Sequence, residues 1–255
     1  MPISSDVLFH FTIRLENLES ILTSDFRPHF SLENLNVIMP DSEHTHELEF
    51  AIPMVSFCDI PLSQTIQHME VYGSYGIGLS KEWGKSRGVC PVLYTVPHSF
   101  LALKLRSLIE NISDIPGTSA SSNELLDDFH DATCYIKPYE GKVILANGDE
   151  ATVRFYDERE WRYVASLPTE SFRYGLDKEG FNDQSIRQKA NDHLWSQDRL
   201  EFVPNDIKYL IVKSEDEILE LIMKVEAIKK PRYSPDEIKL LTSRIISAER
   251  IQSDL

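Results

Sequence analysis

Two glutamates separated by a single residue lie in the segment YDEREWRY at residues 156–163. If this segment enters a strand, the two-residue period places Glu158, Glu160 and Arg162 on one face. Adjacent carboxylates repel, so one of them holds its proton more tightly unless the arginine neutralises it. Such a pair suits acid–base catalysis or the stabilisation of a cation. The alternative is a solvated edge strand whose Glu and Arg side chains pair across a sheet.

Two further polar residues lie in apolar segments. His10 lies within LFHFT, where it shares a strand face with Leu8 and Thr12. Ser56 lies near the end of an apolar strand, just before a helix start, which is where functional loops are often anchored. A hydrogen-bonded core histidine and an ordinary strand end are the alternatives. Both residues are candidates for a binding site.

A tyrosine-rich and glycine-rich segment follows at residues 72–79. Tyr72 and Tyr75 flank a glycine, and an aromatic ring beside bare backbone can stack on a flat heterocycle. Tyrosine is also common on half-buried strands, which is the alternative. The glycines follow the order G-x-x-G-x-G, which is not the dinucleotide-binding fingerprint of Rossmann folds.

Composition excludes several other functions. The formal charge of −15 makes nucleic acid an unlikely partner, although the sequence does not exclude it. Three widely spaced cysteines without a C-x-x-C pair fit a reducing compartment. His44 and His46 have no obvious third ligand, so we expect no metal site. There is no run of about 18 apolar residues, so we expect a cytoplasmic protein without a membrane span.

These residues need a framework of short strands and amphipathic helices. Apolar runs and alternation predict strands at 7–11, 50–57, 89–96, 151–156, 160–165 and 207–212, and the glycines predict a turn into a strand at 72–79. Helical spacing and start signals predict helices at 15–22, 62–71, 99–112 and 124–135 and two helices after residue 214. We interpret residues 25–49 as a polar loop and 113–123 as a linker. The fold class is therefore α+β, with residues 1–213 as the core domain and 214–255 as a helical extension.

The order of these motifs resembles the ADP-ribosyltransferase fold, in which a split antiparallel sheet holds NAD in a cleft. The resemblance implies that Glu160 is catalytic on the nicotinamide ribose and that Glu158 faces the acceptor. It also implies that NAD is the substrate, bound by His10, Thr12, Ser56, Tyr72 and Tyr75. In that assignment His10 contacts the adenosine-side ribose, Ser56 supports the nicotinamide end, and Tyr75, or Tyr72 if the turn is shifted, stacks on the nicotinamide.

Longer phrases resemble the AbiGi family of bacterial abortive-infection, phage-resistance proteins. They are LFHFT, FRPHFSLE, VSFCDIPLSQTIQHMEVYGSYGIGLSKEWG and DEREWRY. That family is described as the antitoxin-side component of a two-protein defence system. The resemblance therefore implies a bacterial cytoplasmic protein in anti-phage defence, with a protein partner.

Three functions follow as hypotheses. The leading one is an NAD-using, ADP-ribosyltransferase-like enzyme that modifies or depletes a cellular target. The alternative is a non-catalytic antitoxin or sensor that neutralises a partner toxin through its acidic surface, including the helix predicted at 214–229. The third is a phosphotransferase acting on nucleotides or RNA ends, which needs basic residues in the cleft. The candidates for that role are Arg14, Arg27, Lys81 and Arg162.

Overall fold

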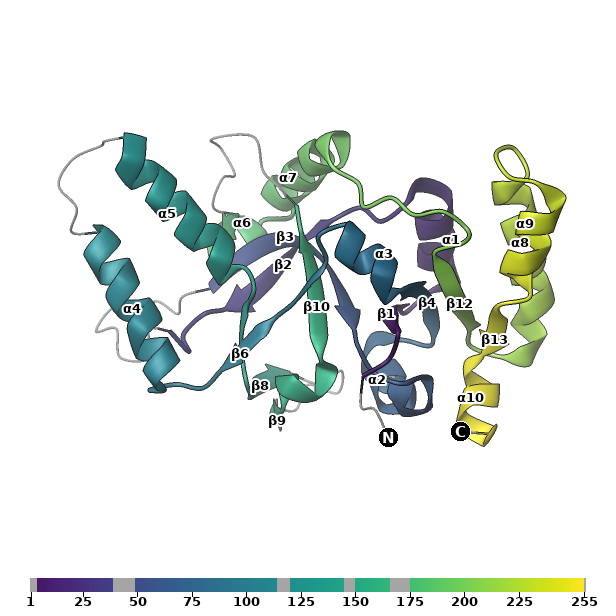
Figure 1. Ribbon diagram of the computed structural model, residues 1–255, viewed down its shortest axis with the longest axis horizontal. Coiled ribbons are helices and arrows are strands. Elements are labelled where there is room, and N and C mark those ends of the chain that lie inside the picture. The colour runs from purple at the N-terminus through teal and green to yellow at the C-terminus, as the bar shows by residue number, and fades with distance from the viewer. Residues whose placement is uncertain (1–3, 39–48, 114–119, 145–149, 166–174, 255) are drawn as a thin grey trace.

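The computed structural model describes residues 4–38, 49–113, 120–144, 150–165 and 175–254. A mixed sheet runs through the molecule in the order β13-β12-β4-β1-β3-β10-β5, with β2 and β11 also paired to β3 (Figure 1). Its strands are β1 (Val7–Thr12), β2 (His29–Asn34), β3 (Glu49–Cys58), β4 (Tyr75–Ser80), β5 (Cys90–Pro91), β10 (Glu160–Val164), β11 (Leu176–Asp177), β12 (Ile207–Val212) and β13 (Ile245–Ser247). Two small sheets pair β6 (Leu93–Thr95) with β7 (Ile136–Pro138) and β8 (Gly141–Ile144) with β9 (Glu150–Val153).

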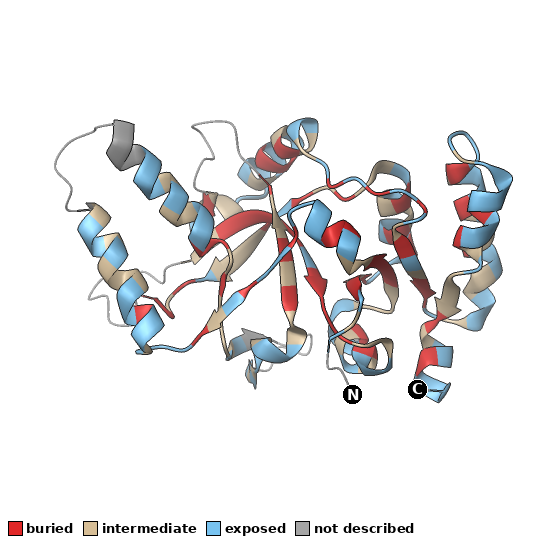
Figure 2. Ribbon diagram, viewed as in Figure 1, coloured by how far each residue is buried: buried red, intermediate tan, exposed pale blue. Residues whose placement is uncertain are grey.

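Helices cover both faces of the central sheet. They are α1 (Leu15–Ser24), α2 (Thr65–Tyr72), α3 (Lys81–Ser86), α4 (Phe100–Ser113), α5 (Ala120–Thr133), α6 (Lys178–Asn182), α7 (Gln184–Gln197), α8 (Ile218–Lys229), α9 (Pro235–Thr242) and α10 (Ala248–Asp254). Leu8 packs with side chains of α1, α3 and α8, whereas Phe9 and Phe11 pack with α2 and α10. Because successive strand residues face opposite ways, β1 divides the two main cores. Figure 2 shows these buried positions concentrated on the central strands.

The sheet opens between β1 and β3. These two strands share a single residue pair, Phe9 with Cys58, whereas β1 pairs with β4 along its whole length. On the same edge of β3, β2 begins to pair only at Met54. Residues 55–57 of β3 therefore pair with neither β1 nor β2. Of these three residues only Ser56 is exposed, so the opening presents Ser56 to any group that enters it.

Several expected elements agree with the structure. The α+β class is confirmed, as are β1, β3, β4, β10 and β12 near their expected bounds. Both capping boxes form, at Ser214 with Glu217 and at Ser234 with Glu237. Each places a serine hydroxyl and a glutamate carboxylate on backbone N–H groups at a helix start. The first capping box begins the 3-10 turn that leads into α8, and the second begins α9.

Other expectations are wrong. The segment 25–49 is not a loop throughout, because His29–Asn34 forms β2 on β3. The single strand expected at 89–96 is two short strands, β5 and β6, in different sheets. Helix α5 begins at Ala120, inside the expected linker. The two C-terminal helices are three, and β13 between them pairs in parallel with β12.

The proposed boundary at residue 213 stays a prediction, although β13 joins the sheet of the preceding region. Within the described ranges, every helix is too short or too polar to span a bilayer.

Candidate functional site

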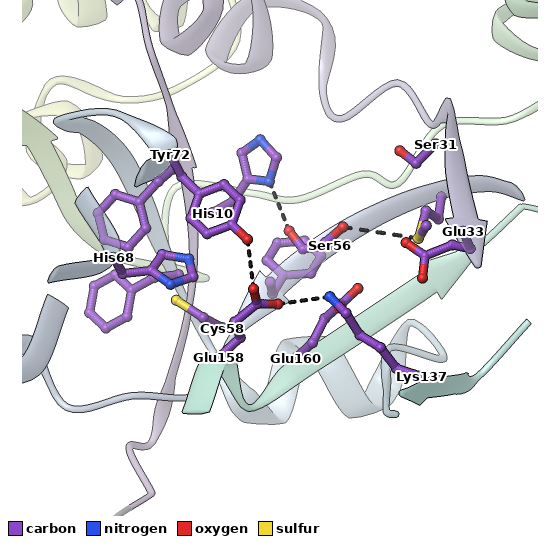
Figure 3. A pocket seen from close by; sticks show the side chains of 14 residues that line it. His10, Ser31, Glu33, Ser56, Cys58, His68, Tyr72, Lys137, Glu158 and Glu160 are labelled. Atoms are coloured by element: carbon purple, nitrogen blue, oxygen red, sulfur yellow. Dashed lines mark hydrogen bonds and ion pairs between the residues drawn. The ribbon is translucent and has the colours of Figure 1, made fainter. Parts of the chain in front are cut away.

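A pocket of about 250 Å³ lies at the opening between β1 and β3 (Figure 3). Helix α2 and strands β2 and β7 close its sides. Side chains from six separate segments of the sequence meet there, because the sheet places these segments side by side. The lining residues are Phe9, His10, Phe11, Ser31, Glu33, Met54, Ser56, Phe57, Cys58, His68, Tyr72, Lys137, Glu158 and Glu160.

The pocket contains a network of buried ions. The guanidinium of Arg162, fully buried behind Glu160, donates from Nε to Glu160 Oε1 at 2.6 Å and from its terminal nitrogen to Glu33 Oε2 at 2.7 Å. Lys137 Nζ donates to Glu160 Oε2 at 2.6 Å and to Glu158 Oε2 at 2.7 Å. Three carboxylates and two cations give this ion cluster a formal charge of −1. Both oxygens of Glu160 are thus fixed by protein donors.

Burial and pairing act in opposite directions on these carboxyl groups. Burial raises the pKa of Glu160, but the charges of Arg162 and Lys137 outweigh burial and hold its pKa below the usual value. At Glu33 burial is the stronger effect, and its pKa is raised despite Arg162. Glu160 is therefore ionised at neutral pH, and Glu33 takes up a proton before Glu160 does.

Aromatic side chains cover the other side of the pocket. The Tyr72 hydroxyl donates to Glu158 Oε1 at 2.7 Å, and the ring of Tyr72 lies 4.3 Å from that of His68. Burial lowers the pKa of His68 to about 4, so this imidazole is neutral at pH 7. Phe11 also lies near His68, with 5.5 Å between ring centres. The three rings, inclined to one another by 34° and 56°, form an aromatic wall next to a carboxylate.

His10 fills part of the opening in the sheet. Its Nδ1 lies 2.9 Å from the carbonyl oxygen of Ser56, and its ring packs edge-on against Phe26 and Phe57. Burial lowers the pKa of His10, which favours the neutral imidazole. An Nδ1–H donor to the carbonyl satisfies a β3 backbone group that has no strand partner. His10 is thus a hydrogen-bonded histidine and also a residue that lines the pocket.

Cys58 is the thiol that lines the pocket. Its side chain is buried, and burial raises the pKa of the thiol well above its usual value. A thiol becomes a nucleophile only when it is deprotonated. Cys58 therefore supplies apolar surface rather than a nucleophile.

The pocket contains five of the seven residues expected at the site. His10, Ser56, Tyr72, Glu158 and Glu160 line it together. Thr12 and Tyr75 do not line it, and they pair with each other across β1 and β4. The hydroxyl of Thr12 accepts a hydrogen bond from Asn17 at 2.7 Å, and Tyr75 donates to Glu217 at 2.8 Å. Of the two tyrosines considered for stacking, Tyr72 is the one at the pocket.

The strand pattern expected around Glu158 is only half right. Glu160 and Arg162 lie on one face of β10, as expected, and are joined by a hydrogen bond of 2.6 Å. Glu158 instead ends the 3-10 helix η2 (Phe155–Glu158), and Arg159 turns the chain with φ of 46°. The turn at Arg159 brings the two carboxylates together, and Lys137 donates a hydrogen bond to each of them. Strand alternation does not place them on one face.

Sequence reasoning missed Glu33, His68 and Lys137. Glu33 lies in the segment interpreted as a loop, although Phe30 and Leu32 alternate there with Ser31 and Glu33, which is a strand signal. His68 lies on the expected helix, one turn before Tyr72, where spacing puts both on one face. Lys137 lies in a three-residue strand with no distinctive pattern.

The basic residues considered for phosphate binding do not converge. Of the described residues Arg14, Arg27, Lys81 and Arg162, none lines the pocket. Lys81 pairs with Asp59 at 2.8 Å, and Arg162 is enclosed by its own acidic partners. The one cation that lines the pocket, Lys137, is shared by two carboxylates. Unpaired positive charge for a phosphate is therefore lacking among the lining residues. The other expected cluster, His44 and His46, lies outside the described residues.

Comparison with known proteins gives two matches. A family model described as "Putative abortive phage resistance protein AbiGi, antitoxin" matches residues 34–213. A protein of Lactococcus lactis subsp. cremoris named "Abortive phage resistance protein AbiGi" is 28% identical over 255 residues, which cover 90% of this chain and 99% of that protein. No solved structure matches the chain. The matched region contains most of the pocket, from Glu49 of β3 to Val164 of β10.

Proposed function

The chain belongs to the AbiGi family of abortive phage resistance proteins, and we propose that it acts in that defence as an ADP-ribosyltransferase-like enzyme that uses NAD. One observation carries this proposal. His10, Ser56, Tyr72, Glu158 and Glu160, which are far apart in the sequence, line a single pocket where the sheet opens between β1 and β3. An opened sheet with these residue types is the arrangement that the resemblance to the transferase fold implies.

The charge of the pocket suits cleavage of the glycosidic bond of NAD. The bond between C1′ of the nicotinamide ribose and the pyridinium nitrogen breaks, and its electron pair leaves with neutral nicotinamide. Positive charge then develops at C1′, and the ion cluster with its formal charge of −1 stabilises that charge more than it stabilises the ground state. A nucleophile bonds to C1′ and loses its proton.

Arg162 and Lys137 would hold Glu160 in position for this step. They keep the carboxylate ionised at neutral pH, and they fix both of its oxygens before substrate arrives. A preorganised carboxylate needs no reorganisation when the positive charge develops. The aromatic wall of Tyr72 and His68 offers a stacking surface for the nicotinamide ring.

Pocket size and charge limit what part of NAD would enter. A volume of about 250 Å³ is smaller than the roughly 300–1,000 Å³ of pockets that enclose a drug-sized ligand. The lining residues also offer no unpaired cation for a diphosphate. In this proposal the nicotinamide riboside end occupies the pocket, and the phosphates lie outside it.

The direct test is release of nicotinamide from NAD. Purified full-length protein is incubated with NAD, with and without extract of phage-infected cells, and free nicotinamide is measured by chromatography. We expect release by the wild type and loss of about two orders of magnitude in Glu160→Gln. Glu150→Gln, an exposed carboxylate paired with Lys142, is the control. Absence of release under every condition, with no NAD binding by calorimetry, refutes the proposal.

A second function, that of an antitoxin without catalysis, has its own support. The matching family model carries that description, and the chain has a net charge of −15, which suits contact with a basic partner protein. Co-expression with the product of a neighbouring gene discriminates between the two. If Glu160→Gln protects cells from that product as well as the wild type does, protection comes from binding and not from the pocket.

A further inference from the structure

Glu33 is the member of the ion cluster that has a carboxylate oxygen left for another partner. Its Oε2 accepts a hydrogen bond from Arg162 at 2.7 Å, and within the described part of the chain no donor contacts its Oε1. In Glu160, by contrast, both oxygens accept hydrogen bonds, from Arg162 and Lys137. Both oxygens of Glu158 are also engaged, one by a tyrosine hydroxyl and the other by Lys137. Oε1 of Glu33 is therefore the oxygen best placed to bind a further group.

Neighbouring groups hold the Glu33 carboxylate in place. Strand β2 pairs with β3, and alternation along β2 puts Ser31 and Glu33 on one face, where both line the pocket. The Glu33 side chain is only 15% exposed. Arg162, which fixes its orientation, is itself held by Glu160 and by the carbonyl oxygen of Cys134. A general base acts from a fixed position within hydrogen-bond reach of the proton, and these contacts give Glu33 such a position.

Glu33 and the aromatic wall lie at opposite ends of the pocket. In Figure 3, Tyr72 and His68 lie at one end and Glu33 at the other, with Glu160 between them. In the proposed reaction the nicotinamide ring stacks on the aromatic wall, and C1′ develops its charge beside Glu160. A nucleophile that enters from the side opposite the leaving group therefore reaches C1′ next to Glu33. Inverting glycosidases place their general base on that side of the sugar for the same reason.

The other titratable side chains along the pocket are unsuited to take this proton. Burial lowers the pKa of His68 to about 4 and also lowers the pKa of His10, so both imidazoles are weak bases. Burial raises the pKa of the Cys58 thiol and of the Tyr72 hydroxyl, so both stay protonated. Burial opposes the charge of Lys137, but the neighbouring carboxylates outweigh burial and raise its pKa, so its ammonium has no lone pair to offer.

Burial makes Glu33 a stronger base than an ordinary glutamate. The charged groups that face it are Arg162 and Glu160 on β10 and Lys137 on β7. Burial raises the pKa of Glu33 more than the two cations lower it, and the charge of Glu160 raises it as well. Cys134, just after α5, stays a neutral thiol because burial raises its pKa to about 12. A base is most effective when its pKa approaches the working pH, so the raised pKa favours this role.

We propose that Glu33 is a catalytic residue that accepts the proton of an O–H nucleophile as this nucleophile attacks C1′. The inference rests on the proposed cleavage of NAD. The oxygen of the nucleophile bonds to C1′, the bond from C1′ to the pyridinium nitrogen breaks, and its electron pair leaves with neutral nicotinamide. The proton passes to Oε1 of Glu33 and from there to solvent. Water as the nucleophile gives ADP-ribose, and the hydroxyl group of an acceptor gives an ADP-ribosylated acceptor.

The test measures nicotinamide release from NAD by full-length Glu33→Gln and two matched variants. Glu160→Gln removes the same charge from the ion cluster, so the two differ in the role of the lost carboxylate. Glu49→Gln is the control, because Glu49 is 14% exposed and paired with Lys178 but does not line the pocket. Azide is added as a second nucleophile, since it has no proton to lose and needs no base. Circular dichroism and melting curves establish that each variant is folded.

We expect Glu33→Gln to release nicotinamide about 10²–10⁴-fold more slowly than the wild type, and azide to restore its rate by at least about tenfold. Azide should not restore Glu160→Gln, and Glu49→Gln should stay within about twofold of the wild type. The wild-type rate should fall by about tenfold per pH unit below the pKa of Glu33, because the base must be ionised. Glu33→Gln should lack this dependence.

A Glu33→Gln rate within about twofold of an active wild type overturns the inference and leaves the cleavage of NAD standing. Equal recovery of Glu33→Gln and Glu160→Gln in azide overturns it as well. So does a wild-type rate that does not fall at low pH, a measurement that needs no variant. Absence of release by the wild type overturns the inference together with the proposed function. With NAD labelled in its adenosine part, free labelled ADP-ribose identifies water as the nucleophile, and label on macromolecules of the extract identifies an acceptor hydroxyl.

Discussion

Replacing Arg162 by methionine should destabilise the protein more than replacing Glu160 by glutamine. The wild-type ion cluster has three carboxylates and two cations, a formal charge of −1. Arg162→Met leaves one cation for three carboxylates, a charge of −2. Glu160→Gln leaves two carboxylates and two cations, which balance. The two substitutions thus change the same network in opposite electrostatic directions.

The contacts give the size of each effect. Arg162 donates to both oxygens of Glu160, to Glu33 and to the carbonyl oxygen of Cys134, and its side chain is fully buried. Removing one partner of a buried ion pair costs about 3–5 kcal/mol. Glu160→Gln leaves Arg162 paired with Glu33 and costs about 1–3 kcal/mol. At about 3 °C per kcal/mol, the melting temperature falls by about 12 °C in the first variant and about 6 °C in the second.

The pH dependence has a definite sign. The pKa of Glu33 is already raised by burial, and loss of Arg162 raises it further. A carboxyl group whose folded-state pKa is raised contributes stability that is present at low pH and is lost as pH rises through that pKa. In Arg162→Met, lowering pH from about 7.5 to about 5.5 therefore recovers part of the lost stability. The wild type gains nothing this way from Glu160, whose pKa is below the usual 4.5.

Urea unfolding followed by tryptophan fluorescence measures both effects, because three tryptophans lie in the described fold. The control is Arg106→Met, which removes an arginine of α4 whose partner Glu110 is exposed. A surface pair of this kind contributes at most about 1 kcal/mol. Two results would show that the ion cluster does not stabilise the fold in this way. One is an Arg162→Met variant that is as stable as Arg106→Met. The other is an Arg162→Met variant that is less stable than Glu160→Gln at low pH only.

Three further predictions concern α2 and its end. Burial keeps His68 neutral with a pKa of about 4, so its contribution to stability is present above pH 6.5 and is lost as pH falls. Urea unfolding of the wild type should therefore show about 2 kcal/mol less stability from His68 at about pH 5 than above pH 6.5, and His68→Asn should remove this difference. An unchanged pH profile in the variant would contradict this. Tyr72→Phe keeps the ring and loses only the bond to Glu158, so calorimetry should find NAD affinity within about twofold, whereas Tyr72→Ser should weaken it about tenfold; equal losses would mean that the hydroxyl and not the ring matters. Gly73→Ala should lower stability by at least about 2 kcal/mol in urea, because the φ is 106° and a Cβ would lie 2.3 Å from the backbone oxygen of Thr12; a neutral effect would show that the turn relaxes freely.

The strands that sequence analysis found are those with a local signal. The apolar run of β1 and the alternation of β10 need no knowledge of their neighbours. The glycines of β4 are explained by contact, because a Cβ at Gly76 or Gly78 would meet the rings of Phe11 or Phe9. Each of these segments carries its own reason to be a strand. β1 and β10 lie within one residue of their expected bounds, and β4 begins three residues into its expected segment.

The elements that were missed depend on distant partners. β2 is a strand because six of its residues pair with β3, some 20 residues later in the sequence. β13 has three residues and is fixed by its parallel pairing with β12, more than 30 residues earlier. Short segments of this kind have too few residues for periodicity to separate strand from loop. Long-range pairing decides their structure.

The local sequence motif contains only part of the ion cluster. From the sequence, Glu158, Glu160 and Arg162 give a charge of −1, which favours a positive charge nearby. The structure adds Glu33, 129 residues from its partner Arg162, and Lys137, 23 residues from Glu160. These two additions cancel, so the ion cluster also has a charge of −1. A local motif can therefore give the right net charge while missing the groups that set each pKa, and only the Glu33 and Lys137 contacts explain why Glu160 stays ionised.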